Sequence, residues 1–150
     1  MKTMKWAFLA LTLFAFAFNS CKKSSSNPPK ASNSISFKLN GTAYSASNIT
    51  AVDSSGTLQV VGIINSTTDI DLVVISNLKV GSFDMASGAA TALFISGASN
   101  DYEGVAGTLT ITSLTSTTVA GTFSFTGTNI INNGTGTFTS GTFQTAYTTK

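Results

Sequence analysis

The feature that most constrains this chain is a strict alternation of apolar and polar residues in short segments, which begins after the first 33 residues. Ile35, Phe37 and Leu39 alternate with polar neighbours, and the same pattern returns around Phe123 and Phe125. Successive side chains of a β-strand point to opposite faces of a sheet, so a period of two is typical of strands with one buried face. Turn residues separate the segments at intervals of about 8–12 positions. We therefore expect an all-β domain, an antiparallel sandwich or barrel-like sheet of about 8–10 strands.

Two hairpins are predicted within this domain. Asn40-Gly41 follows the first strand, and both residues accept positive φ, which makes the pair a strong hairpin signal. Residues 57–64 and 69–76 are apolar on both faces and are separated by a turn at residues 65–68. Strands of this kind are usually covered on both sides, so we expect this second hairpin at the centre of the core.

The last segments contain one irregularity and one open alternative. Phe138 occupies an even position, whereas Phe143 and Tyr147 occupy odd ones, so we expect a bulge or bend at Ser140-Gly141. No proline follows Pro29, so none interrupts the predicted ladders. The small residues at 87–92 could form one helical turn before a short strand, or lead directly into that strand.

The N-terminal region has the organisation of a secretion signal. Lys2 and Lys5 precede a 13-residue run at positions 6–18 that is apolar except for one threonine. A helix that spans a bilayer needs about 20 apolar residues, so this run is short for a permanent anchor. We predict a removable, helical signal peptide over residues 1–20. The only cysteine of the chain, Cys21, follows immediately, and an unpaired thiol in an oxidising compartment requires an explanation.

Ser20-Cys21 resembles the lipobox of bacterial lipoproteins, in which a small residue precedes the cysteine. Phe18 and Asn19 depart from the commonest form of that motif, a departure that lipoproteins of the Bacteroidetes tolerate. The resemblance implies that Cys21 carries diacylglycerol and acyl chains such as palmitate, which hold a protein firmly on a membrane. The alternative is an ordinary secretion signal with an incidental cysteine.

Residues 21–33 are predicted to form a flexible tether, and residues 34–150 a single β-domain. The tether lacks apolar periodicity, and Pro28-Pro29 favours an extended backbone. Lys22 is not the aspartate that signals retention in the inner membrane, and the acidic residues typical of surface lipoproteins are absent after Cys21. We therefore expect the protein at the periplasmic face of the outer membrane, with exposure at the cell surface left open.

Four motifs of the chain carry a further resemblance. They are Phe37-x-Leu39-Asn40-Gly41-Thr42-x-Tyr44, Gly107-Thr108-Leu109-Thr110-Ile111-Thr112, Val119-x-Gly121-Thr122-Phe123-Ser124-Phe125 and Gly141-Thr142-Phe143. With Cys21-Lys22-Lys23 they resemble a family of small Bacteroidetes lipoproteins classed as a domain of unknown function. The resemblance implies a β-rich, membrane-tethered domain and transfers no activity.

Composition excludes several classes of function. Charged residues make up 9% of the chain, and from residue 31 onward three lysines stand against six acids, with no arginine. A nucleic-acid partner is therefore not expected, because binding it requires clustered cations. The chain has no histidine, which removes Ser-His-Asp and Cys-His catalysis and histidine-based metal sites. We predict no enzymatic activity, no cofactor and no metal.

The remaining candidate residues are few. Asp101, Tyr102 and Glu103 lie together in a polar segment and are the best candidates for contact with a ligand, against the alternative of a solvated turn. Asp69 and Asp71 would share one face of a strand and could hold Ca²⁺, but a polar strand start beside a turn explains them better. Once Trp6 leaves with the signal peptide, only tyrosines remain as possible sugar-binding platforms, which counts against glycan binding.

The leading hypothesis is a non-enzymatic envelope lipoprotein that binds another envelope component or has a structural role. The second hypothesis is a carrier of a lipid or small ligand inside a lipocalin-like cavity. Internal volume discriminates between them, because a carrier needs an open apolar lumen and a binding or structural module does not.

Overall fold

The computed structural model describes residues 32–75 and 77–150 and confirms an all-β domain. The predicted signal peptide, Cys21 and most of the tether lie outside the described residues. Within residues 32–75 and 77–150, no helix is long and apolar enough to cross a membrane. The strands are β1 (Ser34–Leu39), β2 (Thr42–Ala46), β3 (Asn48–Ser54), β4 (Thr57–Asn65), β5 (Thr68–Val74), β6 (Gly81–Asp84), β7 (Ala90–Ser96), β8 (Tyr102–Leu114), β9 (Thr118–Asn129), β10 (Thr135–Ala146) and β11 (Thr148–Thr149).

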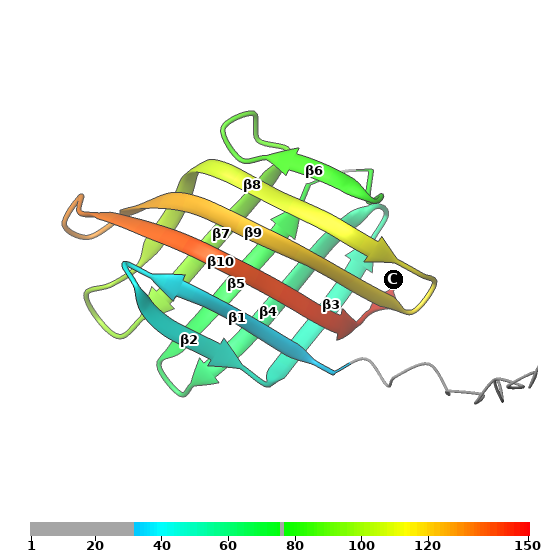
Figure 1. Ribbon diagram of the computed structural model, residues 1–150, viewed down its shortest axis with the longest axis horizontal. Helices are drawn as coiled ribbons and strands as arrows, with labels where there is room; N and C mark the ends of the chain where they lie inside the picture. The colour runs from blue at the N-terminus through cyan, green and yellow to red at the C-terminus, as the bar shows by residue number, and fades with distance from the viewer. Residues whose placement is uncertain (1–31, 76) are drawn as a thin grey trace, which may run out of the picture.

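All the strands belong to one sheet, which curls until its two halves face each other. The order is β11-β3-β4-β5-β7-β8-β9-β10-β1-β2, and β6 pairs with β8 beside this path. In Figure 1, β8, β9, β10, β1 and β2 form the front layer and cross over β3, β4, β5 and β7 behind them. Ser47 alone joins β2 to β3, so the chain passes from one end of the sheet to the other within one residue.

The first hairpin forms as predicted. Ile35, Phe37 and Leu39 of β1 are buried and alternate with exposed neighbours. Asn40 and Gly41 adopt φ values of 49° and 86°, and Leu39 pairs with Thr42 across the two-residue loop. Positive φ at both loop residues matches the right-handed twist of the flanking strands, which is why Asn-Gly favours this turn.

The predicted bulge in the last long strand is also confirmed. The register between β10 and β9 shifts between Phe138 and Gly141, and Ser140 has a φ of 54°. The extra residue lets both Phe138 and Phe143 point into the core despite their different parity. The stretch at residues 87–92 divides between the two alternatives: Ser87 and Gly88 lie in a turn that Gly88 N closes by donating to Met85 O, and β7 begins at Ala90.

Aromatic rings fill the space that the curled sheet encloses. Phe37 lies 5.7 Å from Phe94 and 5.9 Å from Phe123, measured between ring centroids, so its ring contacts both layers. Phe125 and Phe138 stack at 4.1 Å with an interplanar angle of 12°. Close offset and edge-to-face pairs of this kind add to the stabilisation from burial. The interior is therefore a filled core.

The expectation that the second hairpin is covered on both faces is wrong. Leu58 and Val60 of β4 are buried with Ile70 and Leu72 of β5, but on the opposite face Ile63 is 44% exposed. A single curled sheet encloses a core only on its concave side, and within the described residues no further layer covers the convex side. On the concave face Gly62 is buried and Ile64 packs partly buried against the core, and the register shifts between Ile63 and Asn65.

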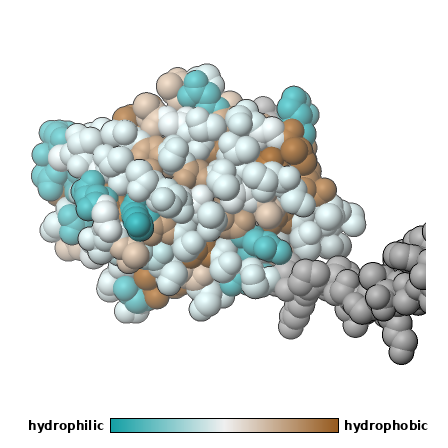
Figure 2. All heavy atoms as spheres, in the orientation of Figure 1, coloured by the Kyte–Doolittle hydropathy of each residue, from teal (hydrophilic) through white to brown (hydrophobic). Residues whose placement is uncertain are grey.

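Hydroxyl side chains replace charges on much of the outer surface. One row crosses six strands in register, and its members are Ser82, Thr110, Thr122, Thr142, Ser36 and Ser45. The pairs Ser82–Thr110 and Ser36–Thr142 each bring two hydroxyl oxygens within 2.9 Å. The face seen in Figure 2 is accordingly pale, with few strongly hydrophilic residues. Threonine suits this role because its branched side chain favours strands and its hydroxyl group remains polar.

The bulge supplies a test of this fold. A Cβ at Gly141 would overlap the ring and the carbonyl group of Phe123, so Gly141→Ala should lower the free energy of unfolding by about 2 kcal/mol. Ser140→Gly is the matched control, because glycine adopts positive φ without steric cost and should leave stability unchanged or raise it by up to about 1 kcal/mol. Urea denaturation measures both. Equal destabilisation by the two variants would contradict this assignment of the bulge.

Candidate functional site

Four loops gather at the end of the sheet remote from the start of β1. We call this the distal end, formed by residues 40–41, 66–67, 97–101 and 130–134. Strand β1 spans about 20 Å, so the turn after it lies far from Ser34, where the tether would join. Backbone hydrogen bonds link these loops, with Gly97 N donating to Thr67 O and Ile130 N donating to Asp101 O, both at 2.9 Å. The β1–β2 turn and the β9–β10 tip lie on the same side of Figure 1.

Asn129 holds two of these loops in place. It is fully buried, and its Nδ2 donates to Ser99 O at 3.0 Å. Its Oδ1 accepts hydrogen bonds from the backbone N–H groups of Ile131 and Asn132. Sequence reasoning missed this residue, because an asparagine at a hairpin end looks like ordinary turn chemistry until its distant partner is known.

A cleft of about 200 Å³, which we call the mouth cleft, opens at the distal end between the first hairpin and the strands β7 and β8. Its lining includes the side chains of Leu39, Asn40, Thr42, Tyr44, Phe94, Asn100 and Tyr102. Phe94 is fully buried, whereas Tyr44 and Tyr102 are half-buried. Their ring centroids lie 5.4 Å and 6.5 Å from that of Phe94, so the two tyrosines flank one buried phenylalanine.

The tyrosine hydroxyl groups differ in their surroundings. Tyr147 donates to Thr115 O at 2.8 Å and so fastens the C-terminal segment to the β8–β9 turn. Among the hydrogen bonds of the described residues, none involves the hydroxyl of Tyr44 or Tyr102. These two side chains thus offer an apolar face and a polar tip to a ligand in the mouth cleft. The cleft has the volume for one residue-sized group, and larger ligands usually occupy sites of about 300–1,000 Å³.

The three predicted ligand residues do not form one site. Asp101 is used structurally, since its Oδ1 accepts from Ser96 N at 3.4 Å and its carbonyl oxygen holds the neighbouring loop. Tyr102 points inward and lines the mouth cleft. Glu103 points to the opposite face, as the period of two requires of consecutive strand residues.

Glu103 instead borders a groove of about 310 Å³ on the convex face, across β5, β7 and β8. The other carboxylate of this groove is Asp71, whose Oδ2 accepts a hydrogen bond from Gln59 Nε2 at 2.7 Å. Asp71 Oδ1 is buried without a partner in the described part of the chain. Burial raises the pKa of Asp71 above its ordinary value, Gln59 opposes that rise, and nearby Asp69 adds to it.

Neither groove nor cleft has the chemistry of a metal centre in the described part of the chain. Asp69 and Asp71 do share a face of β5, as predicted. However, within residues 32–75 and 77–150 no group of three or more histidine, cysteine or acidic side chains could hold a metal ion.

The space inside the curled sheet bears on the carrier hypothesis. The clefts described above open at the surface, and the phenylalanine rings of the core occupy the interior between the layers. A lipocalin-like carrier needs an apolar lumen to enclose its ligand. The filled interior between the layers differs from the open lumen that a carrier of this kind requires.

The raised pKa of Asp71 generates a prediction about stability. A carboxyl whose pKa is higher in the folded state than in the unfolded state lowers stability where it is ionised, and this cost disappears as the pH falls below about 4. Asp71→Asn should therefore raise the Tm at pH 7 and have progressively less effect towards pH 3. Glu103→Gln, which removes an exposed carboxylate from the same groove, is the control for the change in net charge. A lower Tm for Asp71→Asn at pH 7 would contradict the assignment of burial as the dominant cause.

Comparison with known proteins supports one part of the resemblance noted from the sequence motifs, namely the membership of a domain of unknown function. No match was found among curated proteins or among solved structures. Residues 31–146, which include ten of the eleven strands, match the family described as a domain of unknown function, DUF6252. The chain belongs to this family.

Proposed function

We propose that the protein is a non-enzymatic binding module of the bacterial envelope, held at the outer membrane by a lipid on Cys21, with the mouth cleft as its binding site. The observation that carries this proposal is the pair of half-buried tyrosines, Tyr44 and Tyr102, on either side of the buried Phe94. Exposed aromatic side chains over a packed base supply contact area at little entropic cost, because the core already holds their rings.

The position of the cleft supports this role. A lipid on Cys21 would bring residues 21–33 between the membrane and Ser34, and this segment can span at most about 45 Å. Since β1 then leads away from Ser34 towards Asn40, the mouth cleft lies at the end remote from the attachment point. A tethered domain that presents its cleft away from its anchor is suited to meeting a partner in the periplasm.

The chemistry of the cleft supports binding rather than catalysis. Its lining holds tyrosine, asparagine, serine and threonine side chains together with two apolar ones, and no ionisable acid or base active near neutral pH. The two carboxylates of the convex groove, Asp71 and Glu103, lie on the opposite face of the sheet. The partner we propose is therefore another envelope component, recognised by stacking and hydrogen bonding.

The anchor is tested by Cys21→Ala. This variant should lack acyl chains in mass spectrometry and should move from the membrane fraction to the soluble fraction, because the lipid would supply the hold on the membrane. Ser20→Ala keeps a small residue before the cysteine and should remain acylated and membrane-bound. If Cys21→Ala stays with the membrane, the proposed anchor is wrong.

The binding site is tested by photo-crosslinking in living cells. A photoreactive amino acid at Thr42, on the rim of the mouth cleft, should give a discrete adduct with an envelope component. The same amino acid at Thr117, an exposed position in the turn at the other end of β9, is the control and should give none. The Thr42 adduct should disappear when Tyr102→Ala is added. No adduct at Thr42, or the same adducts at both positions, would contradict the proposal.

A further inference from the structure

Strand β2 lies at one end of the sheet order, with β1 on one side and no strand on the other within the described residues. The turn at Asn40-Gly41 determines which backbone groups of β2 are free. In a two-residue hairpin the residues that flank the loop bond to each other, so the peptide groups of Thr42 face β1. Because this direction alternates along an antiparallel strand, those of Ala43 and Ser45 face away from β1. Each carries one N–H donor and one C=O acceptor.

At the opposite end of the sheet, the edge of β3 is covered by a further strand. There β11 pairs with β3 at Val52 and Asp53, and Lys150 N donates to Asp53 O at 2.9 Å. β2 has no such cover, and it also lacks the devices that usually protect an edge strand, which are a charged side chain, a proline or a bulge. An open, uncharged edge of this kind is a template for another strand.

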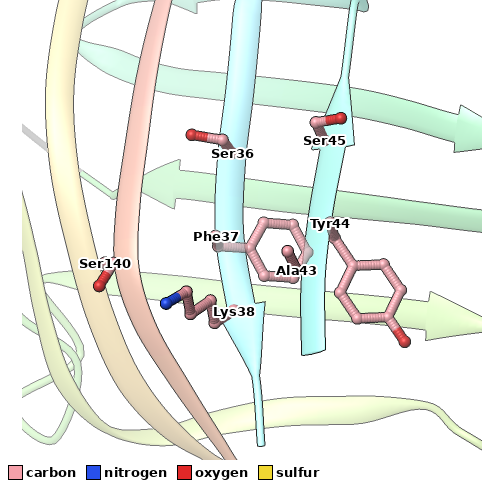
Figure 3. Close-up of a pocket in the computed structure, with 7 residues that line it drawn as sticks. All are labelled: Ser36, Phe37, Lys38, Ala43, Tyr44, Ser45 and Ser140. Carbon is pink, nitrogen blue, oxygen red and sulfur yellow. The ribbon is translucent and has the colours of Figure 1, made fainter. Parts of the chain in front are cut away.

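Two depressions flank this edge, one on each face of the sheet. On the concave side lies the mouth cleft, which Tyr44 lines. On the convex side a groove of about 310 Å³ crosses β10, β1 and β2, and its polar lining comes from Ser36, Lys38, Ser45 and Ser140. Figure 3 shows Lys38 pointing towards Ser140 and the ring of Tyr44 on the side of β2 away from β1. The edge is therefore bordered by aromatic surface on one face and by hydroxyl groups and an ammonium group on the other.

We propose that β2 binds an extended segment of a partner polypeptide, which adds to the sheet as an antiparallel strand. This inference rests on the proposed function and names the class of partner that the mouth cleft takes. In strand addition, backbone hydrogen bonds supply affinity, and pockets for alternate side chains supply specificity. The free backbone groups of Ala43 and Ser45 supply the hydrogen bonds, and the two depressions supply the pockets.

The register predicts the character of the bound segment. Paired residues of adjacent strands point to the same face of a sheet. Segment residues opposite Ala43 and Ser45 would face the convex groove, where Ser45 ends the row of hydroxyl groups and Lys38 carries a positive charge. The residue opposite Tyr44 would face the mouth cleft. The preferred segment thus has an apolar residue between two residues that are hydroxylated or acidic.

A second copy of the chain fits this edge less well. Stable interfaces bury roughly 1,200–2,000 Å² in total, and two five-residue strands in contact bury much less. The chain's own segment before β1 is also a poor occupant, since Pro28 and Pro29 have no N–H to donate. A partner segment of suitable sequence avoids both problems. Its backbone N–H groups can donate, and its side chains can enter the two depressions and so enlarge the contact.

The test uses the full chain in detergent micelles and a synthetic library of seven-residue peptides. In the library a serine, threonine or acidic residue alternates with an apolar one, and a scrambled library of the same composition is the control. Alternating peptides should bind and scrambled ones should not, and a bound peptide should slow amide hydrogen exchange at Ala43 and Ser45. Ala43→Pro should weaken binding at least tenfold, because proline removes an outward N–H that the fold itself does not use. Ala43→Ser retains this N–H and should bind as the unaltered chain does.

Three results would overturn the inference. They are an alternating library that yields no binder, peptides that bind Ala43→Pro equally well, and a dimer in sedimentation experiments that Ala43→Pro abolishes, which would make a second copy the occupant. If Ala43→Pro fails to fold, Ser45→Pro tests the other outward N–H in the same way. A crosslink at Thr42 in cells without any peptide binding would leave the proposed binding site standing and overturn strand addition alone.

Discussion

The structure depends on one constraint, which is that a single sheet must cover its own apolar face. Within the described residues no helix or second sheet is available to do so, and the sheet curls until its two halves share one core. Large rings make this possible, because Phe37 reaches Phe94 in the facing layer while it contacts Phe123 and Phe138 in its own. The convex side then remains open, which explains why hydrophobic residues such as Ile63 and Ile75 are exposed there.

Local features of this fold could be predicted from the sequence because they depend on neighbouring residues. Alternation identified the buried face of β1, Asn40-Gly41 identified the hairpin, and the parity of Phe138 and Phe143 located the bulge. The curl could not be predicted, since it arises from pairings between strands far apart in the chain. The two-residue β11 on β3 and the placement of β6 beside β8 were missed for the same reason.

The candidate site shows the same division between local and distant information. Asp101, Tyr102 and Glu103 are adjacent in sequence and were predicted as one contact region, yet a strand sends consecutive side chains to opposite faces. Applied to this segment, the period of two would have separated Tyr102 from Glu103. It could not have shown that Tyr44 of β2 packs against Phe94, because β2 and β7 are far apart in the strand order and only the curl brings them together, whereas Tyr102 is the direct cross-strand partner of Phe94.

The low charge of the domain has a consequence for how its edges behave. Most edge strands avoid pairing with other chains through charged side chains, and this surface is instead covered by threonine and serine. Hydroxyl groups keep a sheet hydrated without repelling another strand, so the row that ends at Ser45 favours an added strand of similar composition. An open edge is a liability for a protein free in solution. For a domain that a membrane tether would confine to the envelope, the same edge would offer a selective surface to an extended segment of a partner.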